Sequence, residues 1–150
     1  MLKIVIYKTK LKFNIRMKYF TINELIASDV AKNNNINNIP NQQEKNNLTA
    51  LVDNILDPLR EAYGKPIIVT SGFRSEKLNK LVKGSSTSQH RFGQAADIRS
   101  KEDTKNENKK LFDLIQNLNL PFDQLIDEYN YDWVHVSYSP RNRKQILHIK

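Results

Sequence analysis

The chain of 150 residues contains no cysteine, which excludes both a disulfide framework and a thiolate metal site. Histidine is almost as scarce, because only His90, His135 and His148 are present. Any transition metal must therefore be bound by histidine, aspartate or glutamate side chains. The lack of cysteine and the scarcity of histidine reduce the candidate metal ligands to a few positions.

Long apolar runs are also missing. None approaches the roughly 20 residues that a helix needs to cross a bilayer, so no membrane span is expected. Residues 1–7 are mostly apolar, but lysine and arginine interrupt the stretch that follows, and no small-residue cleavage site is present. We therefore identify no signal peptide. Residues 1–16 are interpreted as an N-terminal extension or an edge strand, because Met17 is a plausible second start.

The charges are unbalanced, with 24 lysine and arginine residues against 16 aspartate and glutamate residues and a formal net charge of +8. Such an excess favours an anionic partner, such as nucleic acid, anionic lipid or an acidic cell-wall polymer. The basic residues are scattered, however, without a dense basic run or a basic patch interleaved with aromatic residues. We therefore expect no stable nucleic-acid partner.

Periodicity and turn residues predict an α+β fold. In chain order, they indicate helices at 22–31, 48–64, 75–82 and 111–118 and strands at 66–70, 95–98, 122–129, 133–138 and 146–149. Thr21 and Glu24 have the spacing of a capping box, and Pro58 is expected to kink the second helix. Because helices precede a mostly antiparallel sheet, we expect one domain over 17–150, with helices on one side of a small sheet.

The most informative segment is 88–97, Ser-Gln-His-Arg-Phe-Gly-Gln-Ala-Ala-Asp. It places His90 and Asp97 seven positions apart, with a turn at Gly93 between them. A surface salt bridge is the ordinary explanation of such a pair. If the turn folds both side chains onto one point, however, an imidazole and a carboxylate become available to one metal ion.

A second histidine of interest, His135, lies in the strand-like run Trp-Val-His-Val-Ser at 133–137. Because strand side chains alternate with period two, Trp133, His135 and Ser137 share one face. A lone strand histidine is usually a buried, hydrogen-bonded residue. If this strand pairs with the strand of Asp97, two imidazoles and one carboxylate converge, and a zinc ion bound there keeps a fourth position for water.

These segments resemble the M15 family of zinc peptidases, and the Thr-Ser-Gly-Phe-Arg-Ser segment at 70–75 matches the family's upstream arginine segment. The resemblance covers roughly residues 18–139. The family contains bacterial D-Ala-D-Ala carboxypeptidases and dipeptidases and phage peptidoglycan endopeptidases. It is structurally akin to the signalling domain of Hedgehog proteins, so the resemblance implies that fold.

By this resemblance, His90, Asp97 and His135 are the ligands of Zn²⁺, which lowers the pKa of its water to about 7 and polarises the scissile carbonyl. A carboxylate must take the proton of the water. Many members place it three residues before the last histidine, which is Asp132 here. Glu128 is the second candidate, because a hairpin turn could bring it alongside the metal.

For each remaining candidate site residue, an ordinary structural role is the alternative to a functional one. Arg74 resembles the family's substrate-anchoring arginine, which suits a terminal carboxylate or a developing oxyanion; the alternative is a surface salt bridge. Ser88 is expected to bind the substrate backbone or to orient His90, or else to cap its loop. Trp133 is expected in the core rather than in a cleft wall, and His148 is expected to be exposed rather than a ligand.

The sequence thus predicts a monomeric zinc peptidase that hydrolyses peptidoglycan stem peptides, as a D,D-carboxypeptidase or a lytic endopeptidase. The alternative is a non-catalytic zinc-binding module of the same fold, as in the Hedgehog branch. Without a recognisable signal peptide, the expected place of action is either the cytoplasm or, as for a phage lysin, the cell wall after release.

Overall fold

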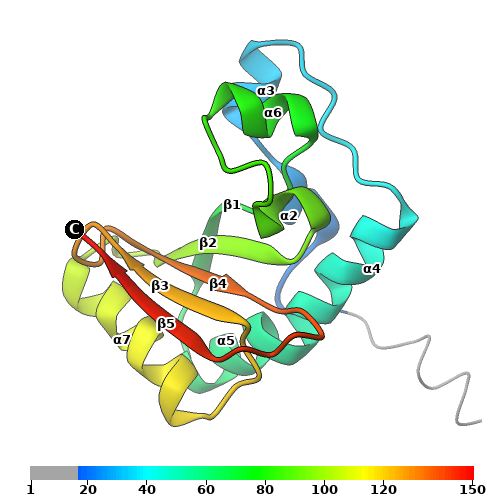
Figure 1. Ribbon diagram of the computed structural model, residues 1–150. Coiled ribbons are helices and arrows are strands. Elements are labelled where there is room, and N and C mark those ends of the chain that lie inside the picture. Colours follow the sequence, from blue (N-terminus) through cyan, green and yellow to red (C-terminus); the bar gives the residue numbers. More distant parts are fainter. Residues whose placement is uncertain (1–16) are drawn as a thin grey trace, which may run out of the picture.

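The computed structural model describes residues 17–150, so the prediction for residues 1–16 lies outside the described part. The elements, in chain order, are α2 (Ile22–Ile26), α3 (Asp29–Asn33), α4 (Gln42–Leu51), the π-helical η1 (Val52–Leu56), α5 (Asp57–Tyr63), β1 (Ile67–Ser71), α6 (Glu76–Leu81), the 3₁₀ helix η2 (Gln89–Phe92), β2 (Ala95–Ser100), α7 (Lys105–Asn117), β3 (Gln124–Glu128), β4 (Trp133–Ser137) and β5 (Gln145–Ile149) (Figure 1). Over residues 17–150, no helix has both the length and the apolar character of a membrane span.

The five strands form one sheet in the order β1-β2-β4-β3-β5. All neighbouring strands are antiparallel except β5, which runs parallel to β3. The predicted α+β class and the mostly antiparallel sheet are therefore confirmed. In Figure 1, α5 and α7 lie on one side of the sheet, and α2, α3 and α6 gather beyond its other side.

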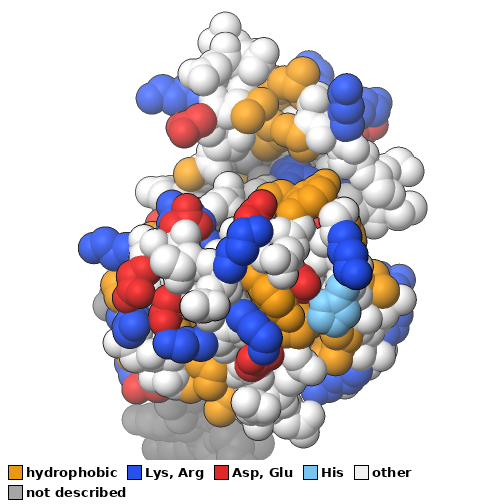
Figure 2. Space-filling view, turned by 90° about the vertical axis from the view of Figure 1, so that its left-hand side faces the viewer, with side chains coloured by type: hydrophobic (Ala, Val, Ile, Leu, Met, Phe, Trp, Pro, Cys, Tyr) orange, Lys and Arg blue, Asp and Glu red, His pale blue; other side chains and the backbone are white. Residues whose placement is uncertain are grey.

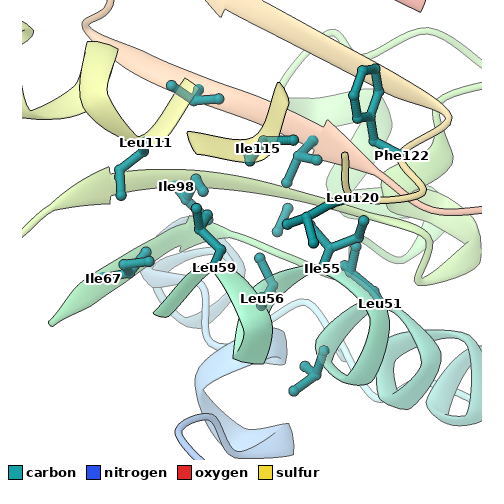
Figure 3. Close-up of a cluster of buried hydrophobic side chains, with 14 of the residues drawn as sticks. Leu51, Ile55, Leu56, Leu59, Ile67, Ile98, Leu111, Ile115, Leu120 and Phe122 are labelled. Carbon is teal, nitrogen blue, oxygen red and sulfur yellow. The ribbon is translucent and has the colours of Figure 1, made fainter. Parts of the chain in front are cut away.

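The hydrophobic core lies between the sheet and the helices α5 and α7. Val134 and Val136 of β4 are fully buried and point to this side, as period two requires. Leu111 and Ile115, one turn apart on α7, meet them from the helix side. Figure 3 shows side chains of this cluster from α4, η1, α5, β1, β2, α7 and the connection before β3, namely Leu51, Ile55, Leu56, Leu59, Ile67, Ile98, Leu111, Ile115, Leu120 and Phe122. The opposite face of the sheet carries Asp97 and His135 beside the apolar Ile126 and Trp133.

The helix predicted over 22–31 is instead two short helices. The capping box at its start is confirmed, because the Thr21 hydroxyl accepts a hydrogen bond from the amide of Glu24, whose carboxylate accepts one from the amide of Thr21. Ala27 is extended, however, and Ser28 caps a new helix, α3. A serine that satisfies free backbone N–H groups favours this restart.

The second predicted helix begins earlier than expected. Asn41 caps α4 with a capping box that includes Glu44, although the apolar pattern starts only at Leu48. Near Pro58 the chain stays helical through the π-helical segment η1. Proline has no N–H to donate to the carbonyl four residues earlier, and the wider π turns accommodate this loss.

Charges on the surface are mixed. Figure 2 shows basic and acidic side chains interspersed over the lower part of one face, and hydrophobic side chains clustered in its upper part. Exposed apolar residues of the helices α3 and α6 include Val30 and Leu81. On this face the net positive charge is therefore not gathered into one basic area.

Candidate metal centre and active site

The pairing of β2 with β4 places Asp97 directly opposite His135. Side chains of directly opposed residues in an antiparallel pair point to the same side. Nδ1 of His135 accordingly lies 3.0 Å from Oδ1 of Asp97, and both residues are buried. The predicted pairing of these two strands is confirmed.

His90 reaches the same point from the 3₁₀ helix η2. The Ser88 hydroxyl caps this helix by accepting from the amide of His90 at 3.4 Å, which is the loop-capping role. Nδ1 of His90 lies 2.8 Å from the carbonyl oxygen of Gly72. Because a carbonyl only accepts, Nδ1 carries the proton, and in the neutral imidazole Nε2 is left as an acceptor. Nε2 faces Oδ1 of Asp97 at 3.3 Å.

The turn that joins His90 to Asp97 needs a glycine. Gly93 has a φ of +70°, and a Cβ there would lie 2.5 Å from the carbonyl oxygen of Glu44. We expect Gly93→Ala to lower the free energy of unfolding by about 3 kcal/mol, from the left-handed backbone and the clash together. Gly64→Ala is the matched control, because Gly64 has a φ of +73° with nothing near its Cβ; about 1 kcal/mol is expected there. Chemical denaturation measures both, and equal losses would rule out the clash.

The three candidate ligand atoms lie within 4.8 Å of one another. A tetrahedral zinc ion with bonds of about 2.0–2.1 Å separates its ligand atoms by about 3.3–3.4 Å, close to the 3.0 and 3.3 Å found around Oδ1 of Asp97. Burial lowers the pKa of His90, which favours the neutral imidazole that a metal requires. Burial alone would raise the pKa of Asp97, but interactions with the two histidines outweigh it and hold that pKa below its usual value. The donor set therefore fits a divalent cation.

Arg74 binds Oδ2 of Asp97, the oxygen that does not face the histidines. Its Nη2 lies 3.2 Å from Oδ2 of Asp97, and its Nε donates to the Ser71 hydroxyl at 2.9 Å. Its backbone N–H donates to the carbonyl of His90 at 3.0 Å. Arg74 thus ties two of the candidate ligands together, and its Asp97 contact is largely buried rather than a surface salt bridge.

A cleft of about 470 Å³ opens over this cluster. Its walls come from the loop after α6, the helix η2, the strands β2, β3 and β4, and the segment after β4. They are formed by Arg74, Gly84, Ser85, Thr87, Ser88, Gln89, His90, Asp97, Gln124, Ile126, Glu128, Trp133, His135, Arg141 and Arg143. Trp133, expected in the core, instead lies in the cleft wall with its ring 5.2 Å from that of Tyr129.

A family model described as Peptidase M15 matches residues 18–137, which include both histidine segments and Arg74. The chain belongs to the M15 peptidase family. Among curated proteins, none matches the chain significantly. Family membership supports a peptidase, and the His–Asp–His cluster gives this M15 peptidase a group of side chains that can hold a metal ion.

The structure does not bring Asp132 to the cluster of this M15 peptidase. Its carboxylate pairs with Lys105 at 2.9 Å and is half exposed, and it lines a separate hollow beside α7. Asp132 lies in the turn before β4, which begins at Trp133, and its carboxylate is directed toward Lys105 at the start of α7. Which of the two carboxylates acts as the base stays a prediction, and this placement favours Glu128 over Asp132.

Glu128 lies on the side of the sheet that faces the cleft and carries His135. It is paired with Trp133, just as Ile126 is paired with His135, so its side chain points to the cleft that it lines. Burial, and then the negative charge of Asp97, raise the pKa of Glu128 above its ordinary value. A carboxylate with a raised pKa beside a candidate metal cluster is suited to proton transfer.

The third histidine lies away from the cluster. His148 on β5 is about half exposed, and its Nδ1 lies 3.1 Å from Oδ2 of Asp127. It does not belong to the candidate ligand set.

Sequence reasoning missed three residues beside the cleft. Arg141 and Arg143 lie in its wall, beyond the region matched by the family model. Asp123, which is fully buried just before β3, binds both of them. The basic segment after residue 139 has no periodic pattern, so its position beside the candidate metal cluster could not be predicted from the sequence.

Proposed function

We propose that this protein is a zinc-dependent peptidase that hydrolyses peptidoglycan stem peptides, as a D,D-carboxypeptidase or a lytic endopeptidase. One observation carries the proposal. Two imidazole nitrogens, Nε2 of His90 and Nδ1 of His135, converge on Oδ1 of Asp97 at 3.3 and 3.0 Å in a buried setting. A proton satisfies one such contact, whereas a divalent cation is bound by all three atoms at once.

In this proposal, Nε2 of His90, Oδ1 of Asp97 and Nδ1 of His135 hold Zn²⁺. The bound ion would polarise the scissile carbonyl and lower the pKa of a water molecule. Arg74 keeps Asp97 in position through Oδ2, and the Gly72 carbonyl fixes the tautomer of His90.

Glu128 is proposed as the general base and acid. Its carboxylate accepts a proton from the attacking water and passes that proton to the leaving amine. Its place in the cleft wall and its raised pKa support this role. Trp133 and the loop after α6 line the cleft of about 470 Å³ in which the peptide would lie, and the net positive charge favours approach to an anionic wall. We propose that the protein acts as a monomer.

The test is the release of D-alanine or muropeptides from purified cell walls by the zinc-loaded protein, followed by mass spectrometry. We expect chelation to lower the rate about a hundredfold, in line with several kcal/mol of electrostatic stabilisation by the ion, and zinc to restore it. His135→Ala should have the same effect, whereas His148→Ala serves as the matched control and should retain full activity.

The outcome also separates an enzyme from a structural metal site. If zinc-loaded protein releases nothing from several wall types, and His135→Ala unfolds the protein, the non-catalytic zinc module is the correct interpretation. If chelation leaves the release of products unchanged, the hydrolysis does not depend on the cluster and the proposed function is wrong.

A further inference from the structure

A buried aspartate organises the part of the cleft wall that lies beyond the family match. Both oxygens of Asp123 are used, because Nε and Nη2 of Arg143 donate to them at 2.9 and 3.0 Å. The hydroxyl of Ser139 and the side-chain amide of Gln89 donate to Oδ2 at 3.0 and 2.9 Å. Asp123 thus fixes the segment after β4 against the helix that carries His90.

The charges around Asp123 do not cancel. Arg141 also contacts it, with Nη2 3.3 Å from Oδ2. Two guanidinium groups therefore share one carboxylate, and within residues 17–150 neither has another acidic partner within 4 Å. The Arg143 side chain is 35% exposed and that of Arg141 58% exposed, and both line the cleft. One positive charge is left to face the cleft, most of it on Arg141.

The strand register locates this charge relative to the proposed chemistry. Along the cleft face of β3, the side chains follow in the order Gln124, Ile126 and Glu128, and Ile126 lies opposite His135. Asp123 directly precedes Gln124, so the arginine pair and Glu128 lie at opposite ends of this row. Two strand residues span about 7 Å. A peptide across the cluster would therefore place a group one or two residues from its scissile bond beside Arg141.

We infer that Arg141, held by Asp123 together with Arg143, is a subsite for a carboxylate of the peptide substrate. The inference rests on the proposed function and deepens it by making an acidic peptide the preferred substrate. The guanidinium fork of arginine matches the two oxygens of a carboxylate and binds them through charge-assisted hydrogen bonds. The carboxylate is either the C-terminus of the peptide or an acidic group within it, and the experiment distinguishes the two.

The experiment uses the zinc-loaded protein and the pentapeptide L-alanyl-γ-D-glutamyl-L-lysyl-D-alanyl-D-alanine in three forms: unmodified, amidated at the C-terminus, and amidated at the α-carboxylate of glutamate. One of the two amidations should lower kcat/KM about tenfold to a hundredfold, the size expected for hydrogen bonds to a charged group. The amidation that lowers kcat/KM shows which of the two carboxylates binds at Arg141.

Arg141→Gln should lower kcat/KM for the unmodified peptide by the same factor, mainly through KM. For the peptide that lacks the recognised carboxylate, the Arg141→Gln substitution should cause no further decrease in kcat/KM. Arg99→Gln is the matched control, because Arg99 pairs with Asp103 outside the cleft, and it should leave all three values unchanged. If Arg141→Gln lowers all three values equally, or none of them, the subsite does not exist.

A binding measurement separates this inference from the proposed function. Trp133 is the only tryptophan of the chain and lies in the cleft wall, so its fluorescence follows peptide binding to the metal-free protein. Wild type should bind the unmodified peptide about tenfold more tightly than the form that lacks the recognised carboxylate, and Arg141→Gln should abolish this difference. If no peptide is cleaved but the difference is found, the proposed function fails and the subsite stands. Equal binding of all three peptides by wild type would overturn the subsite.

Discussion

Replacing Glu128 by glutamine is expected to lower kcat about a thousandfold and to leave KM nearly unchanged, because loss of general acid–base catalysis costs about 10²–10⁴ in rate. Glutamine keeps the size and the hydrogen-bonding ability of the side chain but cannot accept the proton of the attacking water. Steady-state hydrolysis of the pentapeptide measures the effect. Zinc content, determined by mass spectrometry of the intact protein, should stay at one ion per chain.

Asp132→Asn is the matched control for Glu128→Gln. Asp132 points away from the cleft and pairs with Lys105, so kcat should change by less than about twofold, as for a surface ion pair. The opposite pattern, a large loss for Asp132→Asn and none for Glu128→Gln, would return the role of base to Asp132. Loss of zinc from Glu128→Gln would show that Glu128 acts on the metal site rather than on the proton.

Replacing Asp123 by alanine is expected to lower the free energy of unfolding by about 3–5 kcal/mol, the usual cost of breaking a buried charged network. Asp123 is fully buried and accepts from Arg143, Ser139 and Gln89. In the variant, the buried amide of Gln89 and the hydroxyl of Ser139 lose their acceptor. Urea denaturation followed by circular dichroism measures the loss.

The control for Asp123→Ala is Asp113→Ala, which removes a surface carboxylate paired with Lys109 one helical turn away. A loss of about 0.5 kcal/mol or less is expected there. If both variants lose the same small amount, the Asp123 network does not stabilise the fold. Arg141 should also lose its orientation in Asp123→Ala, so the variant should discriminate poorly between the amidated and unmodified peptides.

The stabilisation that Asp123 provides should also depend on pH. Burial opposes its ionisation, but hydrogen bonds from Arg143, Ser139 and Gln89 hold its pKa below the ordinary value. A group whose pKa is lower in the folded state stabilises the fold above its unfolded pKa, about 4. This contribution is lost as the pH falls below 4, so wild type and Asp123→Ala should converge in stability in acid.

The strand period predicted the central part of the site from sequence. Alternation in 133–137 placed Trp133 and His135 on one face, and the pairing of their strand with that of Asp97 brought the three candidate ligands together. The turn at Gly93 was readable because glycine tolerates a positive φ. Strand alternation and a glycine turn can be predicted from sequence because each depends only on neighbouring residues.

Other features depend on contacts between distant segments or on weaker signals. The start of α4 was missed because its first turn is polar, although Asn41 and Glu44 form a capping box there. Asp132 was favoured over Glu128 on reach and register, but it lies in the turn before β4 and its carboxylate pairs with Lys105. Arg141 is placed in the cleft by Asp123, which is 18 positions away in the chain, and no local pattern records such a contact.

The Gly72 carbonyl that accepts from His90 connects the candidate metal cluster to α2. Gly72 is wedged against the end of α2, where any Cβ would lie 2.1 Å from the carbonyl oxygen of Leu25, and the amide of Phe73 donates to that same oxygen at 2.7 Å. A shift of α2 would therefore bear on the Gly72 carbonyl, which accepts the hydrogen bond that orients His90. If the cluster holds zinc, as proposed, substitutions in α2 should change the affinity for the metal while all three ligand side chains stay in place.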